Sequence, residues 1–212
     1  GTGDAGLDVD HDVARLDHLA DVTPSHCGAP VGEVQAGLLL VGIVAVEARV
    51  TKDRQDVLVY TAAAQGSPLS IAGQVQADLW ISADASDADW MVKLIDVAAN
   101  GVARGIAEGV LRSSARDPLK YPALLEPGRR YRVRVDLGHT AATILPGHAL
   151  RVEVAGSSFP MFDRNLHTGE GPAGTHKQVC RQTVYHRAGA ASRLLLPVLP
   201  KRPRGTPNSS RK

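Results

Sequence analysis

The sequence predicts an all-β fold, a sandwich or barrel of about eight antiparallel strands. From residue 56 onward, short runs rich in β-branched and aromatic residues alternate with clusters of turn residues. Within the clearest runs, apolar and polar residues alternate with a period of two, as in strands with one buried face. No amphipathic helical segment separates the runs, so the alternating strand and helix units of a parallel sheet are excluded.

The first half of this region contains three strand signals. Residues 56–61 are rich in β-formers and end before a turn sequence at residues 65–68. Residues 90–97 form another run, which ends at Asn100-Gly101, a dipeptide that favours a tight hairpin. Between them, residues 71–83 place apolar side chains on one parity and mostly polar ones on the other. The apolar set is Val75, Ala77, Leu79 and Ile81.

The second half of this region contains five further expected strands, of differing clarity, and one long loop. Residues 109–116 form a weak run, after which three prolines break the chain. Residues 130–137 direct apolar side chains to one face and charged side chains to the other, which predicts a half-buried antiparallel strand. A loop over residues 159–177 is long and polar, and such loops often carry function. The remaining expected strands are 148–155, 179–186 and 194–199.

The composition is that of a folded protein with an aliphatic core. Of 212 residues, 43% are hydrophobic, 22% are charged and only 4% are aromatic. The net charge of +2 argues against a polyanionic partner, so no nucleic acid is expected. Charge is nevertheless polarised, because residues 1–22 carry six Asp and one Arg, whereas residues 201–212 carry five basic residues and no acid.

We expect three segments along the chain. Residues 1–52 are a poorly specified N-terminal segment, 53–200 are the β-sandwich domain, and 201–212 are a basic disordered tail. Part of the first segment is hypothesised not to be native to the fold, which protection from hydrogen exchange there would refute. The longest apolar run, residues 36–46, is shorter than the ~20 residues that cross a bilayer. No signal peptide is recognised either, so no membrane association and a cytoplasmic location are expected.

Several residue sets have the composition of a reactive site. The letters GxGxxG at residues 1–6 follow no strand, so no cofactor is expected there. Asp and His residues between 8 and 18 are interpreted as a solvated acidic terminus and not as a metal site, and two widely separated cysteines, Cys27 and Cys180, as free thiols. The types of a Ser-His-Asp triad are also present, but the GxSxG motif of a nucleophile elbow is missing. That set comprises Ser157 or Ser158, His148 or His167, and Asp163.

Several motifs, in order, resemble one family. They are the runs at 56–61, 82–97 and 125–128, then Gly147-His148, 151–154, and Ser158-Phe-Pro-Met-Phe-Asp-Arg-Asn165 with Thr168-Gly169. Together they resemble the C-terminal domain of the X-Pro dipeptidyl-peptidase and cocaine-esterase family of serine hydrolases, over residues 53–200. The resemblance implies a jelly-roll β-sandwich, similar to galactose-binding domains. It also implies a partner, an α/β-hydrolase domain in cis or in trans, whose substrate pocket this domain helps to wall.

The resemblance suggests candidate residues for the pocket or domain interface but no catalytic ones. Asp89 and Trp90 match an Asp-aromatic pair near the hydrolase domain, with Trp90 in the core as the alternative. The family's most recognisable loop matches Phe159, Asp163, Arg164 and Asn165, with Arg164 bonding locally. Nothing in residues 1–52 resembles the triad domain. No triad residue can therefore be carried over, and, as argued above, no metal or cofactor is expected.

Two other functions stay open at this point. The chain is a stand-alone jelly-roll module that binds carbohydrate or protein, or it retains catalysis through His148 or His167 with a serine. An accessory domain whose partner is absent should expose an apolar patch larger than that of an ordinary monomer. The family-level activity implied by the resemblance is dipeptidyl-peptidase or ester and amide hydrolysis.

Overall fold

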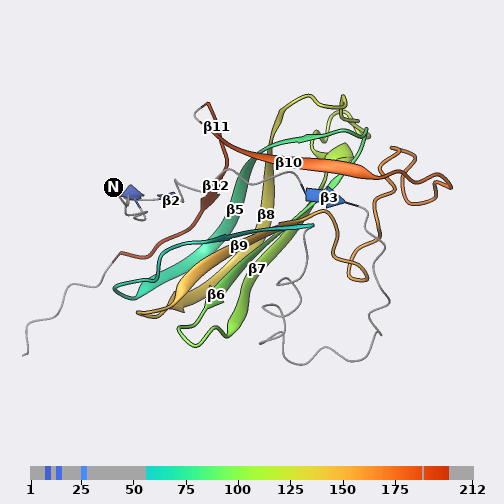
Figure 1. The fold of residues 1–212 in the computed structure, drawn as a ribbon. Helices are drawn as coiled ribbons and strands as arrows, with labels where there is room; N and C mark the ends of the chain where they lie inside the picture. Colours follow the sequence, from blue (N-terminus) through green and yellow to red (C-terminus); the bar gives the residue numbers. More distant parts are fainter. Residues whose placement is uncertain (1–7, 11–12, 16–24, 28–55, 188, 201–212) are drawn as a thin grey trace, which may run out of the picture.

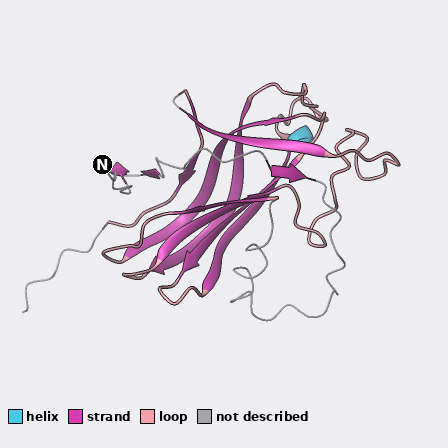
Figure 2. Ribbon diagram, viewed as in Figure 1, coloured by secondary structure: helices cyan, strands magenta, loops and turns pink. Residues whose placement is uncertain are grey.

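The computed structural model describes residues 8–10, 13–15, 25–27, 56–187 and 189–200. Their regular structure is almost entirely β, in two antiparallel sheets that pack as a sandwich (Figures 1 and 2). One short 3₁₀ turn, η1 (Ser113–Ala115), interrupts the strands. The all-β prediction is therefore confirmed for the described part of the chain.

The smaller sheet has four strands in the order β4, β9, β6, β7. These are β4 (Val57–Thr61), β9 (Ala149–Ala155), β6 (Asp89–Val97) and β7 (Ala103–Arg112). All three pairings are antiparallel, and β6 and β7 form a hairpin across Asn100-Gly101. Gly101 has a φ of 82°, so the dipeptide supplies the left-handed residue that the sequence predicted for this turn.

The larger sheet is organised around one long strand, β5 (Leu69–Ala83). Along one side β5 pairs with β8 (Tyr131–Ile144), and along the other with β10 (Cys180–Arg187) and β12 (Arg193–Leu195). Two short strands, β3 (Ser25–Cys27) and β11 (Ala190–Ala191), pair with β10. A separate hairpin consists of β1 (Asp8–Asp10) and β2 (Val13–Arg15).

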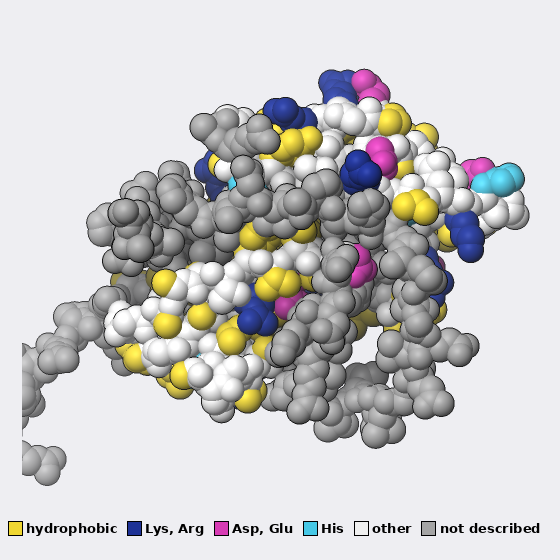
Figure 3. Space-filling view, viewed as in Figure 1, with side chains coloured by type: hydrophobic (Ala, Val, Ile, Leu, Met, Phe, Trp, Pro, Cys, Tyr) yellow, Lys and Arg dark blue, Asp and Glu magenta, His cyan; other side chains and the backbone are white. Residues whose placement is uncertain are grey.

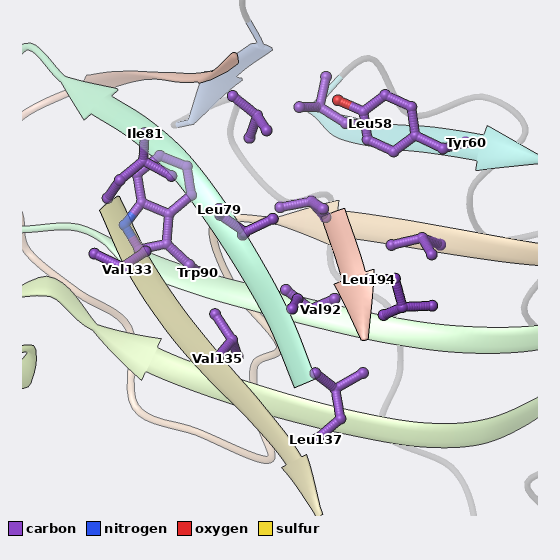
Figure 4. Close-up of a cluster of buried hydrophobic side chains, with 14 of the residues drawn as sticks. Leu58, Tyr60, Leu79, Ile81, Trp90, Val92, Val133, Val135, Leu137 and Leu194 are labelled. Atoms are coloured by element: carbon purple, nitrogen blue, oxygen red, sulfur yellow. The ribbon is translucent and has the colours of Figure 1, made fainter. Parts of the chain in front are cut away.

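The core lies between the two sheets and is mostly aliphatic (Figure 4). The alternation predicted for β5 is confirmed, because its apolar set is at most 4% exposed. Trp90 is the largest fully buried side chain and packs with strands of both sheets. Each fully buried Val, Leu or Ile side chain of this core contributes about 1.5–3 kcal/mol through the hydrophobic effect. Other members of the cluster include Leu58, Tyr60, Val92, Leu94, Val133, Val135, Leu150, Val152 and Leu194.

The two long sides of the sandwich are closed differently. Along one side β7 approaches β8 so closely that a Cβ on Gly109 would lie 2.0 Å from the carbonyl oxygen of Asp136. Along the other, the Tyr60 hydroxyl lies 2.7 Å from His186 Nε2, between β4 and β10. Burial raises the pKa of Tyr60, so its hydroxyl stays protonated in this contact with the imidazole.

Three strands differ in extent from the sequence-based expectation. The run expected at 109–116 is β7, which begins at Ala103 because its pairing with β6 continues to the hairpin turn. The run expected at 130–137 continues through Gly138 to Ile144, because β5 is long enough to pair with all of it. The run expected at 194–199 is reduced to β12 and one bridge between Ile71 and Val198.

Connections of contrasting length collect at the two ends of the strands (Figure 1). One end, here called the turn end, holds the short connections at residues 62–68, 98–102 and 145–148. The other, here called the loop end, holds residues 84–88, 113–130 and 156–179. The loop expected at 159–177 belongs to the loop end, together with most of the candidate residues.

Candidate domain interface at the loop end

The loop end is organised around an ion pair between Asp89 and Arg112. These residues face each other in the β6–β7 ladder. Arg112 donates from Nε and Nη2 to the two carboxylate oxygens of Asp89, each over 2.9 Å. The Asp89 side chain is only 6% exposed and that of Arg112 is 26% exposed, so the carboxylate is shielded from solvent. These hydrogen bonds raise the pKa of Arg112, which keeps the guanidinium charged.

The same ion pair holds the long loop over residues 156–179. Asn165 Nδ2 donates to Asp89 Oδ1 over 2.7 Å, and Arg112 Nη2 donates to the carbonyl oxygen of Asp163 over 3.2 Å. The backbone N–H of His167 donates in turn to the Asn165 side chain. The loop is therefore attached to the strand ends by charge-assisted hydrogen bonds, which are stronger than neutral ones.

Asp87 provides a second buried carboxylate at the loop end. It is 3% exposed and accepts hydrogen bonds from the backbone N–H and the hydroxyl of Ser114. Its carbonyl oxygen lies 3.0 Å from His167 Nδ1, which must donate because a carbonyl only accepts. His167 has a φ of 65°, a left-handed conformation that is rare for a residue with a side chain. These contacts hold that conformation in place.

Arg116 holds the other long loop, residues 113–130. Its guanidinium donates to the carbonyl oxygens of Ser113, Ala123 and Leu124. It also lies over the ring of Tyr131, 4.6 Å from the ring centre. The Leu124 side chain in turn lies against Gly169 of the long loop at 156–179. The two loops thus form one connected surface.

The outside of these two loops is rich in exposed apolar side chains. Leu119 is 93% exposed, Tyr121 71%, Met161 59% and Phe159 55%. The Arg164 guanidinium stacks over the Phe159 ring at 4.4 Å, and so holds that ring at the surface. Figure 3 shows one face of the molecule, where hydrophobic side chains are interspersed with charged ones. Leu124, Phe162 and Val179 are exposed as well.

The structure brings most of the candidate residues to this end. Asp89, Asp163 and Asn165 meet around Arg112, and Arg164 stacks on Phe159 at the surface. Trp90 is instead a core residue, 1% exposed, and donates from Nε1 to the Ser113 hydroxyl. Whether these residues form a pocket or an interface stays a prediction.

Sequence reasoning missed Arg112, although it lies opposite a candidate residue. Counting back from the Asn100-Gly101 turn without interruption pairs Asp89 with Leu111. A β-bulge between Leu94 and Ile95 shifts the register by one residue and brings Arg112 opposite Asp89. Asp87 and Arg116 were missed because their partners are a backbone N–H, a hydroxyl and loop carbonyls, which have no sequence signature. His167 was considered only as a possible base, and its contact with the Asp87 carbonyl was not predicted.

One histidine of the possible Ser-His-Asp set lies apart from its other members. His148 is at the turn end, with Nδ1 2.8 Å from Asp96 Oδ1. His167 and Asp163 are at the loop end, where the Asp87 carbonyl and Arg112 engage them. The Ser157 hydroxyl accepts a hydrogen bond from the backbone N–H of Phe159, a local contact of the kind expected at a strand end.

The remaining sequence features concern metal ligands, membrane spans and the two ends of the chain. In residues 56–187 and 189–200, together with the short described N-terminal strands, no three His, Cys, Asp or Glu side chains are grouped as metal ligands. Over the same residues, no helix has the length and hydrophobicity to cross a membrane. The GxGxxG letters and the tail at 201–212 lie outside the described residues, as do the side chains of the acidic N-terminal cluster. The cytoplasmic location stays a prediction.

Fold and loop end together define a β-sandwich domain whose polar groups hold loops in place. The family model for the X-Pro dipeptidyl-peptidase C-terminal non-catalytic domain matches residues 11–195. The chain therefore belongs to this family, and the resemblance noted in the sequence is confirmed.

Known proteins similar to the chain are larger hydrolases. Cocaine esterase from Rhodococcus sp. (strain MB1 Bresler) is 40% identical over 117 residues, which cover 55% of this chain and 20% of that protein. An aminopeptidase from a marine sediment Thaumarchaeota archaeon superposes with a TM-score of 0.70 at 29% identity. An α-amino acid ester hydrolase superposes with a TM-score of 0.67 at 30% identity. Each structural match covers 74% of this chain and 28% of the other.

Proposed function

We propose that this jelly-roll sandwich is an accessory domain that packs through its loop end on an α/β-hydrolase domain and helps to wall that domain's active site. The activity of the assembly is dipeptidyl-peptidase or ester and amide hydrolysis. The observation that carries the proposal is the apolar surface over two loops that are themselves held rigidly. Family membership supports it, since the matched relatives extend well beyond the region that this chain covers.

The loop end has the properties that a domain interface requires. Exposed aromatic and aliphatic side chains supply the area that is buried on docking, and aromatic residues and Met are enriched at such interfaces. The groups beneath them are fully engaged by hydrogen bonds, so docking costs little loop ordering. The turn end exposes fewer large apolar residues, among them Val102 at 41% and Leu145 at 51%.

A graft tests the proposal. Residues 53–200 replace the corresponding C-terminal domain of Rhodococcus cocaine esterase, and ester hydrolysis is measured on the purified chimera. We expect the graft to be active. Leu119→Ser, Tyr121→Ser and Phe159→Ser together should lower its kcat/KM at least tenfold, because each removes apolar area from the interface.

The matched control changes exposed apolar residues at the turn end. Val102→Ser with Leu145→Ser should leave the activity of the graft unchanged. Circular dichroism establishes that each chimera is folded. Equal losses in the two sets of variants, or a folded graft without activity, would contradict docking through the loop end.

A further inference from the structure

The outer face of the larger sheet carries arginines beside aromatic rings. The side chains that fill the core from β5 and β8 have one parity, and those of the other parity lie on the outside. On this outside, Trp80 of β5 lies in register with Arg132 of β8 on one side and with Tyr185 of β10 on the other. We call the following set the arginine face: Arg130, Arg132, Arg134, Trp80 and Tyr185.

Two of the arginines are positioned by contacts within the sheet. Arg132 donates to both carboxylate oxygens of Asp78, from Nε over 3.1 Å and also from Nη2. The Arg130 guanidinium lies 4.7 Å from the centre of the Tyr185 ring, and the Tyr185 hydroxyl lies 2.9 Å from that of Ser82. A guanidinium has five N–H donors, and Asp78 engages only two of those on Arg132. The face is therefore ordered but still has donors to offer.

Positive charge is in excess on this surface. The side chains of Arg132 and Arg134 are 53% and 54% exposed, whereas that of Asp78 is 6% exposed. Arg193 of β12 is in register with Asp78 and adds a further positive charge at the border of the face. Asp136, the next carboxylate along β8, accepts hydrogen bonds from a neighbouring amide side chain and a backbone N–H. Among the described residues, the arginines outnumber the carboxylates beside them.

The composition and the spacing of the face fit an extended acidic peptide. Arg, Trp and Tyr are the residue types that contribute most to binding at protein–protein interfaces. Alternate residues of a β-strand lie about 7 Å apart, and an extended peptide has the same period. Acidic side chains at every second position of such a peptide would therefore meet Arg130, Arg132 and Arg134 in turn. Each contact between a carboxylate and a guanidinium is a charge-assisted hydrogen bond.

We propose that the arginine face binds an extended segment of a partner protein that carries Asp or Glu at every second position. Trp80 and Tyr185 supply apolar contact beside the charged row. Ionic strength weakens this binding, because the Debye length falls from about 10 Å at 0.1 M salt to about 3 Å at 1 M. The face uses none of the exposed apolar residues at the loop end, so the inference does not depend on the proposed function.

The test compares two fluorescein-labelled decapeptides of identical composition. In one, five Glu alternate with five Thr, and in the other the five Glu are contiguous. Fluorescence anisotropy with the full chain gives the Kd of each, and we expect the alternating peptide to bind about tenfold more tightly. Binding should also change the tryptophan fluorescence of wild type but not of Trp80→Phe, because Trp90 lies in the core.

Charge removal locates the binding surface. Arg130→Gln with Arg134→Gln takes two charges from the face, leaves the contact to Asp78 intact and should raise the Kd about tenfold. The matched control, Arg104→Gln with Lys177→Gln, takes the same charge from exposed residues elsewhere and should leave the Kd as in wild type. Circular dichroism establishes that all variants are folded.

Several outcomes overturn the proposal. They are no binding of the alternating peptide, equal binding of the two peptides, and equal losses in the two double variants. Tighter binding of oligo-dT or of polygalacturonate overturns it as well, and assigns the face to a nucleic acid or to an acidic polysaccharide.

Discussion

The two ends of the sandwich are built on the same strands but are held together by different groups. At the turn end, backbone hydrogen bonds join neighbouring turns, from Gln65 N to the carbonyl of His148 and from Gly147 N to that of Gln65. At the loop end, side chains provide much of the joining, through Asp87, Arg116 and the Asp89–Arg112 pair.

The difference follows from the length of the connections. A short turn satisfies its own polar groups, whereas a long loop that leaves the ladder needs other partners for its N–H and C=O groups. Buried carboxylates and guanidinium groups fill that need, because each satisfies several groups at once. The loop end is therefore rigid enough to present apolar side chains to solvent, which suits docking on a second domain.

Removing a buried carboxylate from each end tests the comparison most strongly. Asp89→Ala should lower the free energy of unfolding by about 3 kcal/mol, because it leaves Arg112 without its partner and frees Asn165. Asp96→Ala at the turn end removes the contact to His148 and should lower it by about 1 kcal/mol. Urea unfolding monitored by Trp fluorescence measures both. Equal effects would show that the loop end does not depend on its ion pair more than the turn end does.

A glycine at each end gives a second, smaller contrast. Gly169 and Gly101 both have a positive φ, of 80° and 82°. Around Gly101 there is open space, whereas a Cβ on Gly169 would lie 2.9 Å from Leu124 Cδ2. Gly101→Ala should therefore lower the free energy of unfolding by about 1 kcal/mol through backbone strain alone.

Gly169→Ala adds the displacement of Leu124 to that strain and should cost about 2 kcal/mol. Thermal unfolding compares the two variants. Limited proteolysis should in addition show faster cleavage in residues 113–130 for Gly169→Ala only, since only that variant separates the two loops. Unchanged cleavage would contradict the contact between the loops as a source of rigidity.

An effect as small as that of Gly101→Ala is expected midway between the ends, at Asp78. Its pKa is lowered in the folded chain from an ordinary value of 3.8, so the carboxylate stabilises the fold above that pH and the contribution is lost as the pH falls through the lowered pKa. Asp78→Asn should flatten the loss of stability below about pH 4 and lower stability at pH 7 by about 1 kcal/mol. Arg132→Gln should flatten the acid limb too. An unchanged slope in both variants would show that the pair is not coupled to folding.

Local patterns made much of the fold predictable. The alternation in β5 and in the first half of β8 identified the buried faces, because successive side chains of a strand point to opposite faces. The Asn100-Gly101 turn was predicted from its own chemistry. Strand lengths were less accessible, since β7 and β8 extend as far as their partners allow.

By itself, the sequence determined the strand faces, the hairpin turn and the family, because each depends on residues that are close together along the chain. Only the tertiary structure decided which side chains meet at the loop end. Arg112 reaches Asp89 through a bulge, and Asn165 joins them from a loop in a distant part of the chain. The tertiary structure likewise decided that β7 and β8 touch at Gly109. Such contacts depend on register and loop closure, which are properties of the assembled sheets and not of any one segment.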